Sequence, residues 1–309
     1  MPLLHSLRLG LNRLIGPLGL ALDKVPKTRW GTNSAVVMAR VGRFSIEVPS
    51  LNPISTHYDF HPDYSSQLGR LVSIVRKKYK QLAAIDVGAN VGDTACIIKS
   101  VEDIPLLCIE GDKFTFSFLE KNLKQFQNAS PHNLFVGEKT GPMAARVEKA
   151  GWNTTILPDQ SNTNTLHITS LDDFLASQTS LETFKLLKVD AEGFDCAIVR
   201  GARGFIDRVH PVVSFEYNRQ NMEVIGEKGI GTLAMLKELG YDKIIFHNAM
   251  GKLLCVASLS EFDLIQDLHD YIGLADNGVI YYDVTLFHAN DDDIADVFAQ
   301  GERLRNRAA

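Results

Sequence analysis

From residue 82 to residue 288, short apolar runs alternate with segments whose apolar residues recur at every third or fourth position. An uninterrupted short run is typical of a strand buried on both faces, whereas the wider spacing is typical of a helix that buries one face. This alternation predicts an α/β fold, a doubly wound and mostly parallel sheet with helices on both faces. The strands are expected at 82–87, 105–109, 134–137, 184–189, 211–217, 241–246 and 279–288.

Helices are expected between these strands and at the end of the chain. Their ranges are 64–79, 91–98, 112–126, a short helix from 170, one ending near 201, then 232–239, 258–271 and a tail from 291. Asp112 and Ser170 are suitable N-caps, and Ser258 with Glu261 forms a potential capping box. Residues 138–166 form a polar insertion that predicts a loop or a hairpin.

The chain divides into four segments in this interpretation. Residues 1–34 form an extension, 35–80 a hairpin and helix, 81–290 the ligand-binding domain, and 291–309 a helical tail. Within 35–80, alternation around Gly42 predicts a hairpin, and the stretch 50–64 is rich in proline, histidine and aromatic residues. Such a stretch either forms a substrate lid or covers the edge of the core.

The extension at residues 1–34 has the pattern of an amphipathic helix, with leucines on one face and no acidic residue before Asp23. Arg8 and Arg13 interrupt its apolar part, so it does not resemble a signal peptide, and it is too short and charged to span a bilayer. It could dock on the protein itself or on a second subunit. Weak contact of residues 1–22 with a membrane surface, or an organellar address, are the alternatives.

The overall composition narrows the class of partner. The net charge of −5 provides no general attraction for phosphate backbones, so we expect a small-molecule or saccharide partner and no nucleic acid. The four cysteines lie far apart and lack metal-ligand spacing. We therefore expect free thiols in a reducing, cytoplasmic compartment, with neither disulfides nor a metal. The oligomeric state is open.

The stretch from Asp86 to Asp93 ends the first strand in small and polar residues and predicts a ligand-binding turn before a helix. A dinucleotide fingerprint has glycines where this chain has Asn90 and Asp93. A carboxylate and an amide at those positions suit a ligand with an ammonium group and hydroxyls, such as S-adenosylmethionine. A purely structural turn is the alternative.

Four strands of the expected sheet end in acidic residues, namely Asp86, Glu110, Asp190 and Glu216. Ligands of open α/β sheets bind at the carboxyl ends of the strands, so we expect these side chains to converge. Glu110 follows the glycine turn at the spacing of an acid that accepts the ribose hydroxyls of a nucleoside, with Gly111 and Asp112 close enough to assist. Alternatively, Glu110 only caps the next helix.

Lys188 lies inside a strand that should be buried, so it needs a partner, for which we propose Glu216 or Asp190. Snorkelling of the lysine to water is the alternative. The candidates for orienting an acceptor hydroxyl or taking its proton are Asp190, Glu192 and Glu216. The rival bases are His61, Tyr64 and His247.

The chain resembles the FkbM family of S-adenosylmethionine-dependent methyltransferases between residues 35 and 288. Four motifs carry the resemblance in family order: Ile85-Asp86-Val87-Gly88-Ala89-Asn90-Val91-Gly92, Ile109-Glu110-Gly111-Asp112, Leu187-Lys188-Val189-Asp190-Ala191-Glu192-Gly193, and Val212 to Glu216. The resemblance implies a Rossmann-like class I methyltransferase fold of seven strands with an antiparallel last strand. It also implies S-adenosylmethionine as cofactor.

The resemblance further implies residue roles and a reaction. Those that would hold the methionine part are Asp86, Gly88, Ala89, Asn90 and Gly92. Glu110 would hold the ribose, Glu138 would lie near the adenine, and Asp190 matches the acid of the third motif. Transfer would go to an oxygen of a sugar, a polysaccharide unit or a natural product. The alternatives are N-methylation or a non-catalytic scaffold with this fold; a nicotinamide oxidoreductase is more distant.

Overall fold

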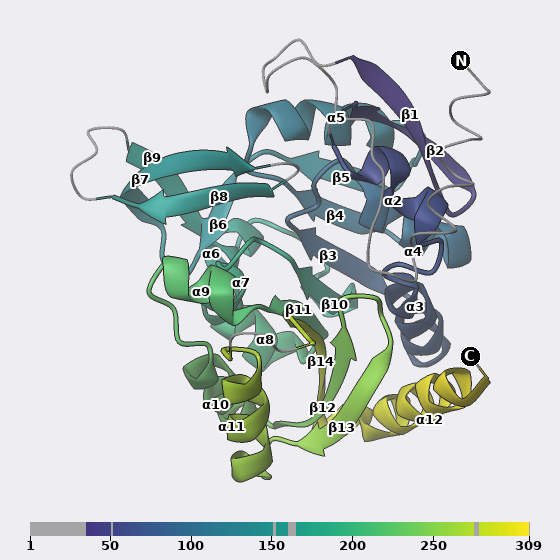
Figure 1. Ribbon diagram of the computed structural model, residues 1–309, viewed down its shortest axis with the longest axis vertical. Helices are drawn as coiled ribbons and strands as arrows, with labels where there is room; N and C mark the ends of the chain where they lie inside the picture. Colours follow the sequence, from purple (N-terminus) through teal and green to yellow (C-terminus); the bar gives the residue numbers. More distant parts are fainter. Residues whose placement is uncertain (1–34, 51, 151–152, 160–164, 275–277, 309) are drawn as a thin grey trace.

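The computed structural model describes residues 35–50, 52–150, 153–159, 165–274 and 278–308 (Figure 1). The expectations for residues 1–34 lie outside these ranges. No helix within them is long and apolar enough to cross a membrane.

The described part of the chain is organised around an eight-stranded sheet. In spatial order its strands are β13 (Leu253–Ser258), β12 (Tyr241–Asn248), β14 (Tyr282–His288), β11 (Val212–Tyr217), β10 (Phe184–Val189), β3 (Ala83–Val87), β4 (Leu106–Ile109) and β5 (Ala129–His132). The five strands from β11 to β5 are parallel, and β14 is antiparallel to both of its neighbours. The predicted class I fold is therefore confirmed, and β13 adds an eighth strand at the edge.

The central strands are apolar because both faces of the sheet are covered. In β3, Ile85 and Val87 join the hydrophobic cluster on one face, while Ala84 joins the cluster on the other. In β10, Leu187 and Leu186 divide in the same way. This alternation follows from the two-residue period of a strand. Near the carboxyl ends of the strands, where the apolar clusters end, positions on one face can carry polar groups.

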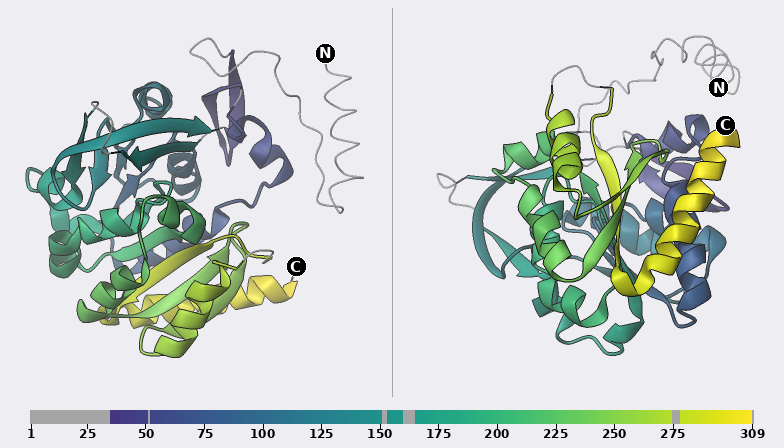
Figure 2. Two further views of the ribbon diagram at one scale, coloured as in Figure 1. Left: turned by 60° about the vertical axis from the view of Figure 1, so that its left-hand side comes forward. Right: turned by 90° about the horizontal axis from the view of Figure 1, so that it is seen from below.

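Helices cover both faces of the sheet (Figures 1 and 2). Those contributing to the first cluster are α6 (Leu171–Leu175), α7 (Asp195–Arg200), α8 (Arg203–Val209), α9 (Arg219–Val224), α10 (Ile230–Glu238) and α11 (Phe262–Tyr271). Those contributing to the second are α2 (Ile54–Phe60), α3 (Ser66–Lys78), α4 (Asp93–Val101), α5 (Lys113–Leu123) and α12 (Asp292–Ala308). As predicted, the side chains of Asp112 and Ser170 cap α5 and α6.

The predicted third strand, 134–137, is corrected. Residues Phe135–Gly137 form β6, which pairs with β9 (Thr165–Ser170) in a separate four-stranded sheet, and β5 occupies the expected place beside β4. The other two strands of the small sheet are β7 (Gly141–Ala150) and β8 (Asn153–Pro158), which form the hairpin predicted for the polar insertion. The chain thus leaves the main sheet after β5.

The helix predicted from residue 258 begins at Phe262 instead. The glutamate half of the capping box forms, because Ser258 N donates to Glu261 Oε2 at 2.7 Å. The serine hydroxyl accepts from Ser260 N and donates to Asp242 Oδ1, so it stabilises the turn before the helix. The residues up to Ser258 belong to β13, which the apolar pattern did not reveal.

The N-terminal hairpin consists of β1 (Val36–Val41) and β2 (Phe44–Pro49), as predicted around Gly42. Its buried side chains Val41, Ile46 and Val48 join the second cluster together with α3 and α4. The terminal helix α12 packs against α3, where Arg70 and Glu302 form a bidentate ion pair of 2.5 and 2.6 Å. The predicted tail helix is confirmed, and both ends of the described chain pack against one face of the sheet.

Candidate active site

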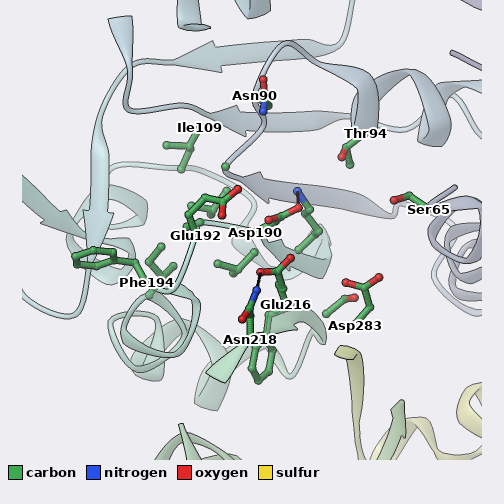
Figure 3. Close-up of a pocket in the computed structure, with 18 of the residues that line it drawn as sticks. Ser65, Asn90, Thr94, Ile109, Asp190, Glu192, Phe194, Glu216, Asn218 and Asp283 are labelled. Carbon is green, nitrogen blue, oxygen red and sulfur yellow. Dashed lines mark hydrogen bonds and ion pairs between the residues drawn. The ribbon is translucent and has the colours of Figure 1, made fainter. Parts of the chain in front are cut away.

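A cavity of about 450 Å³ opens at the carboxyl ends of β3, β4, β10 and β11 (Figure 3). The start of β14 and the segment from α2 to α3 also contribute to its wall. Of the four acidic strand ends, Glu110, Asp190 and Glu216 line it, as expected from the switch in strand order. The size is within the range of small-molecule sites.

The turn between β3 and α4 is built on backbone conformations that favour glycine. Gly88 has a φ of 76°, and a Cβ there would overlap the carbonyl oxygen of Asp190. Asn90 adopts a φ of 47°, which asparagine tolerates better than most residues. Among the described residues, its Oδ1 atom is buried without a hydrogen-bond partner. A buried acceptor of this kind suits a donor on a ligand.

Glu110 ties this turn to the next one. Its two carboxylate oxygens accept backbone hydrogen bonds from Asn90 N (3.1 Å) and Asp112 N (2.8 Å). Burial raises the pKa of Glu110 to about 7, although these two donors oppose the shift. Each carboxylate oxygen has a second lone pair, so the group can still accept hydroxyl donors from the cavity.

The turn after β10 carries two more candidates. Glu192 and Gly193 both have positive φ, 51° and 100°, and the buried Asp195 holds them by accepting from Ala191 N (2.9 Å) and Gly193 N (3.1 Å). Burial, followed by the charges of Asp190 and Asp195, raises the pKa of Glu192 to about 8. This geometry presents the Glu192 side chain to the cavity (Figure 3).

Lys188 has two carboxylate partners in the structure. Its Nζ lies 3.0 Å from Asp86 Oδ1 and 3.6 Å from Asp190 Oδ2, so the predicted Asp190 pair is confirmed. The alternative with Glu216 is wrong for the described structure. The reason is register, because Lys188 lies directly beside Asp86 on β3 and beside Ser214 on β11, two positions before Glu216.

Several predicted cofactor residues support the site without lining it. Asp86 is 1% exposed and is the partner of Lys188, which lines the cavity. Ala89, Gly92 and Asp112 belong to the two turns, and of the second motif Ile109, Glu110 and Gly111 line the cavity.

Glu138, expected near the adenine, lies outside this cavity. Phe135 and Val136 of β6 line the cavity, whereas Glu138 lines an adjoining hollow, where its carboxylate pairs with Arg200 at 2.7 Å. The expected contact of Glu138 with the adenine stays a prediction.

The segment from α2 to α3 contributes part of the cavity wall, and its role as a lid stays a prediction. Tyr64 lines the wall, and Tyr58 donates to Asp93 Oδ2 (2.9 Å) at the start of α4, which holds the segment down. Of the rival bases, His61 is exposed and does not line the cavity. His247 is fully buried, 3.6 Å from Glu302, and also lies outside it.

Sequence reasoning missed a carboxylate on β14. Asp283 lies directly opposite Glu216 in the β11–β14 pair, and both side chains line the cavity (Figure 3). Burial and the charge of Asp190 raise the pKa of Asp283 to about 7, and burial followed by the neighbouring carboxylates raises that of Glu216 well above its usual range. The alternation of Tyr281, Asp283 and Thr285 in the last strand was the available signal.

The charge of the cavity indicates what it can hold. Its ionisable acid and amine groups are six carboxylates and one lysine, namely Asp93, Glu110, Asp190, Glu192, Glu216, Asp283 and Lys188. A ligand with net positive charge is favoured there, and an anionic ligand is not. The orphaned Asn90 Oδ1, the Glu110 carboxylate and this negative wall fit S-adenosylmethionine, which carries ammonium, sulfonium and ribose hydroxyl groups.

Comparisons with known proteins give one family match. Residues 55–243 match the profile described as the methyltransferase FkbM domain, which covers more than half of the 309 residues. A comparison with curated proteins gives no match.

The solved structures that match this chain are distant. Methyltransferase FkbM from Methylobacillus flagellatus KT has 16% identity and a TM-score of 0.40, covering 58% of this chain and 43% of that one. The chain thus spans less than half of that protein. Precorrin-6y C5,15-methyltransferase from Geobacter metallireducens GS-15 has 10% identity and a TM-score of 0.37, covering 72% and 87%. TYW2 from M. jannaschii, in complex with AdoMet, has 9% identity and a TM-score of 0.38, covering 85% and 90%.

Proposed function

The chain belongs to the FkbM methyltransferase family, and from this premise we propose that it transfers a methyl group from S-adenosylmethionine to an oxygen of a hydroxylated acceptor. The acceptor class is a sugar, a polysaccharide unit or another hydroxylated small molecule. The observation that carries the proposal is the acidic cavity, in which the Gly88–Asn90 turn and Glu110 lie at one end and further carboxylates at the other.

The cofactor would occupy the end of the cavity formed by β3 and β4. Gly88 allows close approach of a ligand to the backbone, Asn90 Oδ1 would accept a donor, and Glu110 would accept the ribose hydroxyls. When bound, S-adenosylmethionine supplies a methyl group on a sulfonium that an oxygen can displace. The negative wall would favour the charged cofactor over its uncharged-sulfur product.

The acceptor oxygen needs orientation and a place for its proton. It would form the new bond to the methyl carbon as the carbon–sulfur bond breaks, and its proton would pass to a carboxylate or to water. Asp190 and Glu192 end the strand nearest the Gly88 turn and line the cavity. A pKa of about 8 for Glu192 is close to the operating range, where a base assists most effectively.

A direct test is calorimetric titration of the full chain with S-adenosylmethionine and, separately, with NAD. We expect micromolar affinity for the first, in the range usual for enzyme substrates, and no binding of the second. Glu110→Ala should weaken cofactor binding by about 1.5–3 kcal/mol through two lost charge-assisted hydrogen bonds. Glu120→Gln, an exposed position on α5, is the matched control and should bind as wild type.

The catalytic assignment is tested by turnover on a panel of hydroxylated acceptors. Asp190→Asn or Glu192→Gln should lose about 10²-fold in turnover while cofactor affinity changes less, as for a group that acts mainly in the transition state. If cofactor binds but no acceptor is methylated, the chain is the non-catalytic scaffold considered above. If only amines are methylated, the acceptor atom is nitrogen and not oxygen.

A further inference from the structure

Glu216 and Asp283 form a pair of like-charged groups at the end of the cavity away from Glu110. They are direct partners in the antiparallel β11–β14 pair, and their side chains lie beside one another (Figure 3). Carboxylates placed directly opposite on neighbouring strands repel each other and destabilise the sheet unless something compensates. The described protein provides no cation for this pair within ion-pair distance, since Lys188 is engaged by Asp86 and Asp190.

The protein instead holds each carboxylate in place with a neutral amide. Asn218 Nδ2 donates to Glu216 Oε1 at 3.1 Å, and Gln67 Nε2 donates to Asp283 Oδ2 at 3.3 Å. Gln67 is 8% exposed and lines the same cavity, and its Oε1 has no hydrogen-bond partner among the described residues. The amides fix the orientation of the carboxylates but supply no positive charge. Burial and the neighbouring carboxylates raise the pKa of both groups, so the pair ionises fully only beside a bound cation.

Aromatic rings adjoin the pair. Tyr64 from the α2–α3 segment and Tyr281, which directly precedes β14, line this part of the cavity. The charge of Asp283 is among the causes, after burial, that raise the pKa of both phenols, which places the rings near the pair. Carboxylates together with aromatic rings are the groups with which proteins recognise ammonium ions.

The proposed cofactor does not account for the charge of this pair. Glu110 follows β4, and Asp283 lies on β14, which is four strands away across β3, β10 and β11. At the usual strand spacing, this separation is about 19 Å. A cofactor whose ribose contacts Glu110 would therefore bring its positive groups to the β3–β10 part of the cavity, and the β11–β14 part remains for the acceptor.

We propose that Glu216 and Asp283 form a subsite for an ammonium group on the acceptor, so that the acceptor is a hydroxylated amine. That the bound molecule is the methyl acceptor rests on the proposed function. The binding of a cation by Glu216 and Asp283 does not depend on it. The ammonium group is an anchor that fixes the molecule, while the methyl group goes to a hydroxyl oxygen of the same molecule.

The test uses two small probes that differ only in charge. Choline carries a hydroxyl and a permanent positive charge, and 3,3-dimethylbutan-1-ol is its uncharged isostere. On the full chain saturated with S-adenosylhomocysteine, ligand-observed NMR titration should give choline an affinity at least about tenfold higher, because a single uncompensated charge at close range is worth more than this factor. Asp283→Asn and Glu216→Gln should each reduce the preference, and the double variant should abolish it.

Two controls separate the possible failures. Glu120→Gln removes an exposed carboxylate outside the cavity and should retain the preference. The melting temperatures of Asp283→Asn and Glu216→Gln should stay equal or rise, since each substitution relieves repulsion, so a loss of preference is not a loss of folding. Equal affinity for both probes, binding of neither, or an unchanged preference in the double variant overturns the subsite. If S-adenosylhomocysteine and S-adenosylmethionine fail to bind, the proposed function falls, and the same probes on the ligand-free chain still decide the subsite.

Discussion

Individual carboxyl groups in the cavity hold protons at pH values where they would be ionised in water. Burial is the first cause for Glu110, whose pKa is raised to about 7, and for Glu192, whose pKa is raised to about 8. The charged form lacks solvation there, and the neighbouring carboxylates repel it further. A positively charged ligand would reverse both effects and favour ionisation.

Cofactor binding should therefore release protons. The groups are partly protonated in the free protein and ionised beside a cation, so affinity should rise from pH 6 towards pH 8, by up to about tenfold per pH unit for each proton released. Titration calorimetry in buffers of different ionisation enthalpy measures the number of protons directly. A binding heat that is independent of the buffer would contradict this expectation.

Removing the partner of Lys188 should destabilise the fold. Asp86 is 1% exposed and lies 3.0 Å from the lysine, so Asp86→Asn should lower the free energy of unfolding by about 3 kcal/mol. Glu216→Gln should not have this effect, because the lysine keeps both of its partners. Urea denaturation measures the difference. Glu238→Gln, which breaks an exposed pair with Arg203, is the control and should change the value by less than about 1 kcal/mol.

At the scale of elements, strands buried on both faces were predictable and edge strands were not. The range of β10, 184–189, was predicted correctly because its apolar run is continuous. The edge strand β5, Ala129–His132, is polar and contains Pro131, so its sequence carries no strand pattern. In the site, motifs located Glu110 and Asp190, whereas Asp283 depends on which strand is its neighbour. Pairing between distant segments is not encoded in local periodicity.

The contact between α12 and α3 should contribute less stability at low pH. Burial alone would raise the pKa of Glu302, but the hydrogen bonds and charges of Arg70 and His247 lower it to about 2. A depressed carboxyl pKa adds stability above its unfolded value near 4.5, and that stability is lost as pH falls through 2. Glu302→Gln should thus cost on the order of 2–3 kcal/mol at pH 7, and the difference from wild type should vanish near pH 2.

Urea denaturation at several pH values tests this contact. Asp296→Asn in the same helix removes an exposed partner of Lys243 and is the control. It should cost less than about 1 kcal/mol at pH 7. A cost for Glu302→Gln that stays constant down to pH 2 would show that the ion pair is not its origin.

At the scale of the molecule, the N-terminal hairpin belongs to the fold, whereas residues 1–34 precede it. Deleting 1–34 should leave a folded chain that binds cofactor as the full chain does. Deleting 1–65 should instead abolish folding, because it removes Val41, Ile46 and Val48, all fully buried. At about 1.5–3 kcal/mol each, their loss alone approaches the stability of a typical domain. Thermal melts and cofactor titration of both truncations would check this, and an insoluble 1–34 deletion would contradict it.

The reversed direction of β14 allows acceptor preference to change in evolution independently of cofactor binding. The parallel strands β3, β4, β10 and β11 bring their carboxyl ends to the cavity, whereas β14 runs the other way and brings its beginning. Ile280 and Tyr281 therefore enter the wall from a connection that carries none of the family motifs. Mutations there can alter what the protein accepts while Gly88 and Glu110 remain untouched. Under our proposals, a library randomised at positions 280 and 281 would generate enzymes with new acceptors and an inherited cofactor.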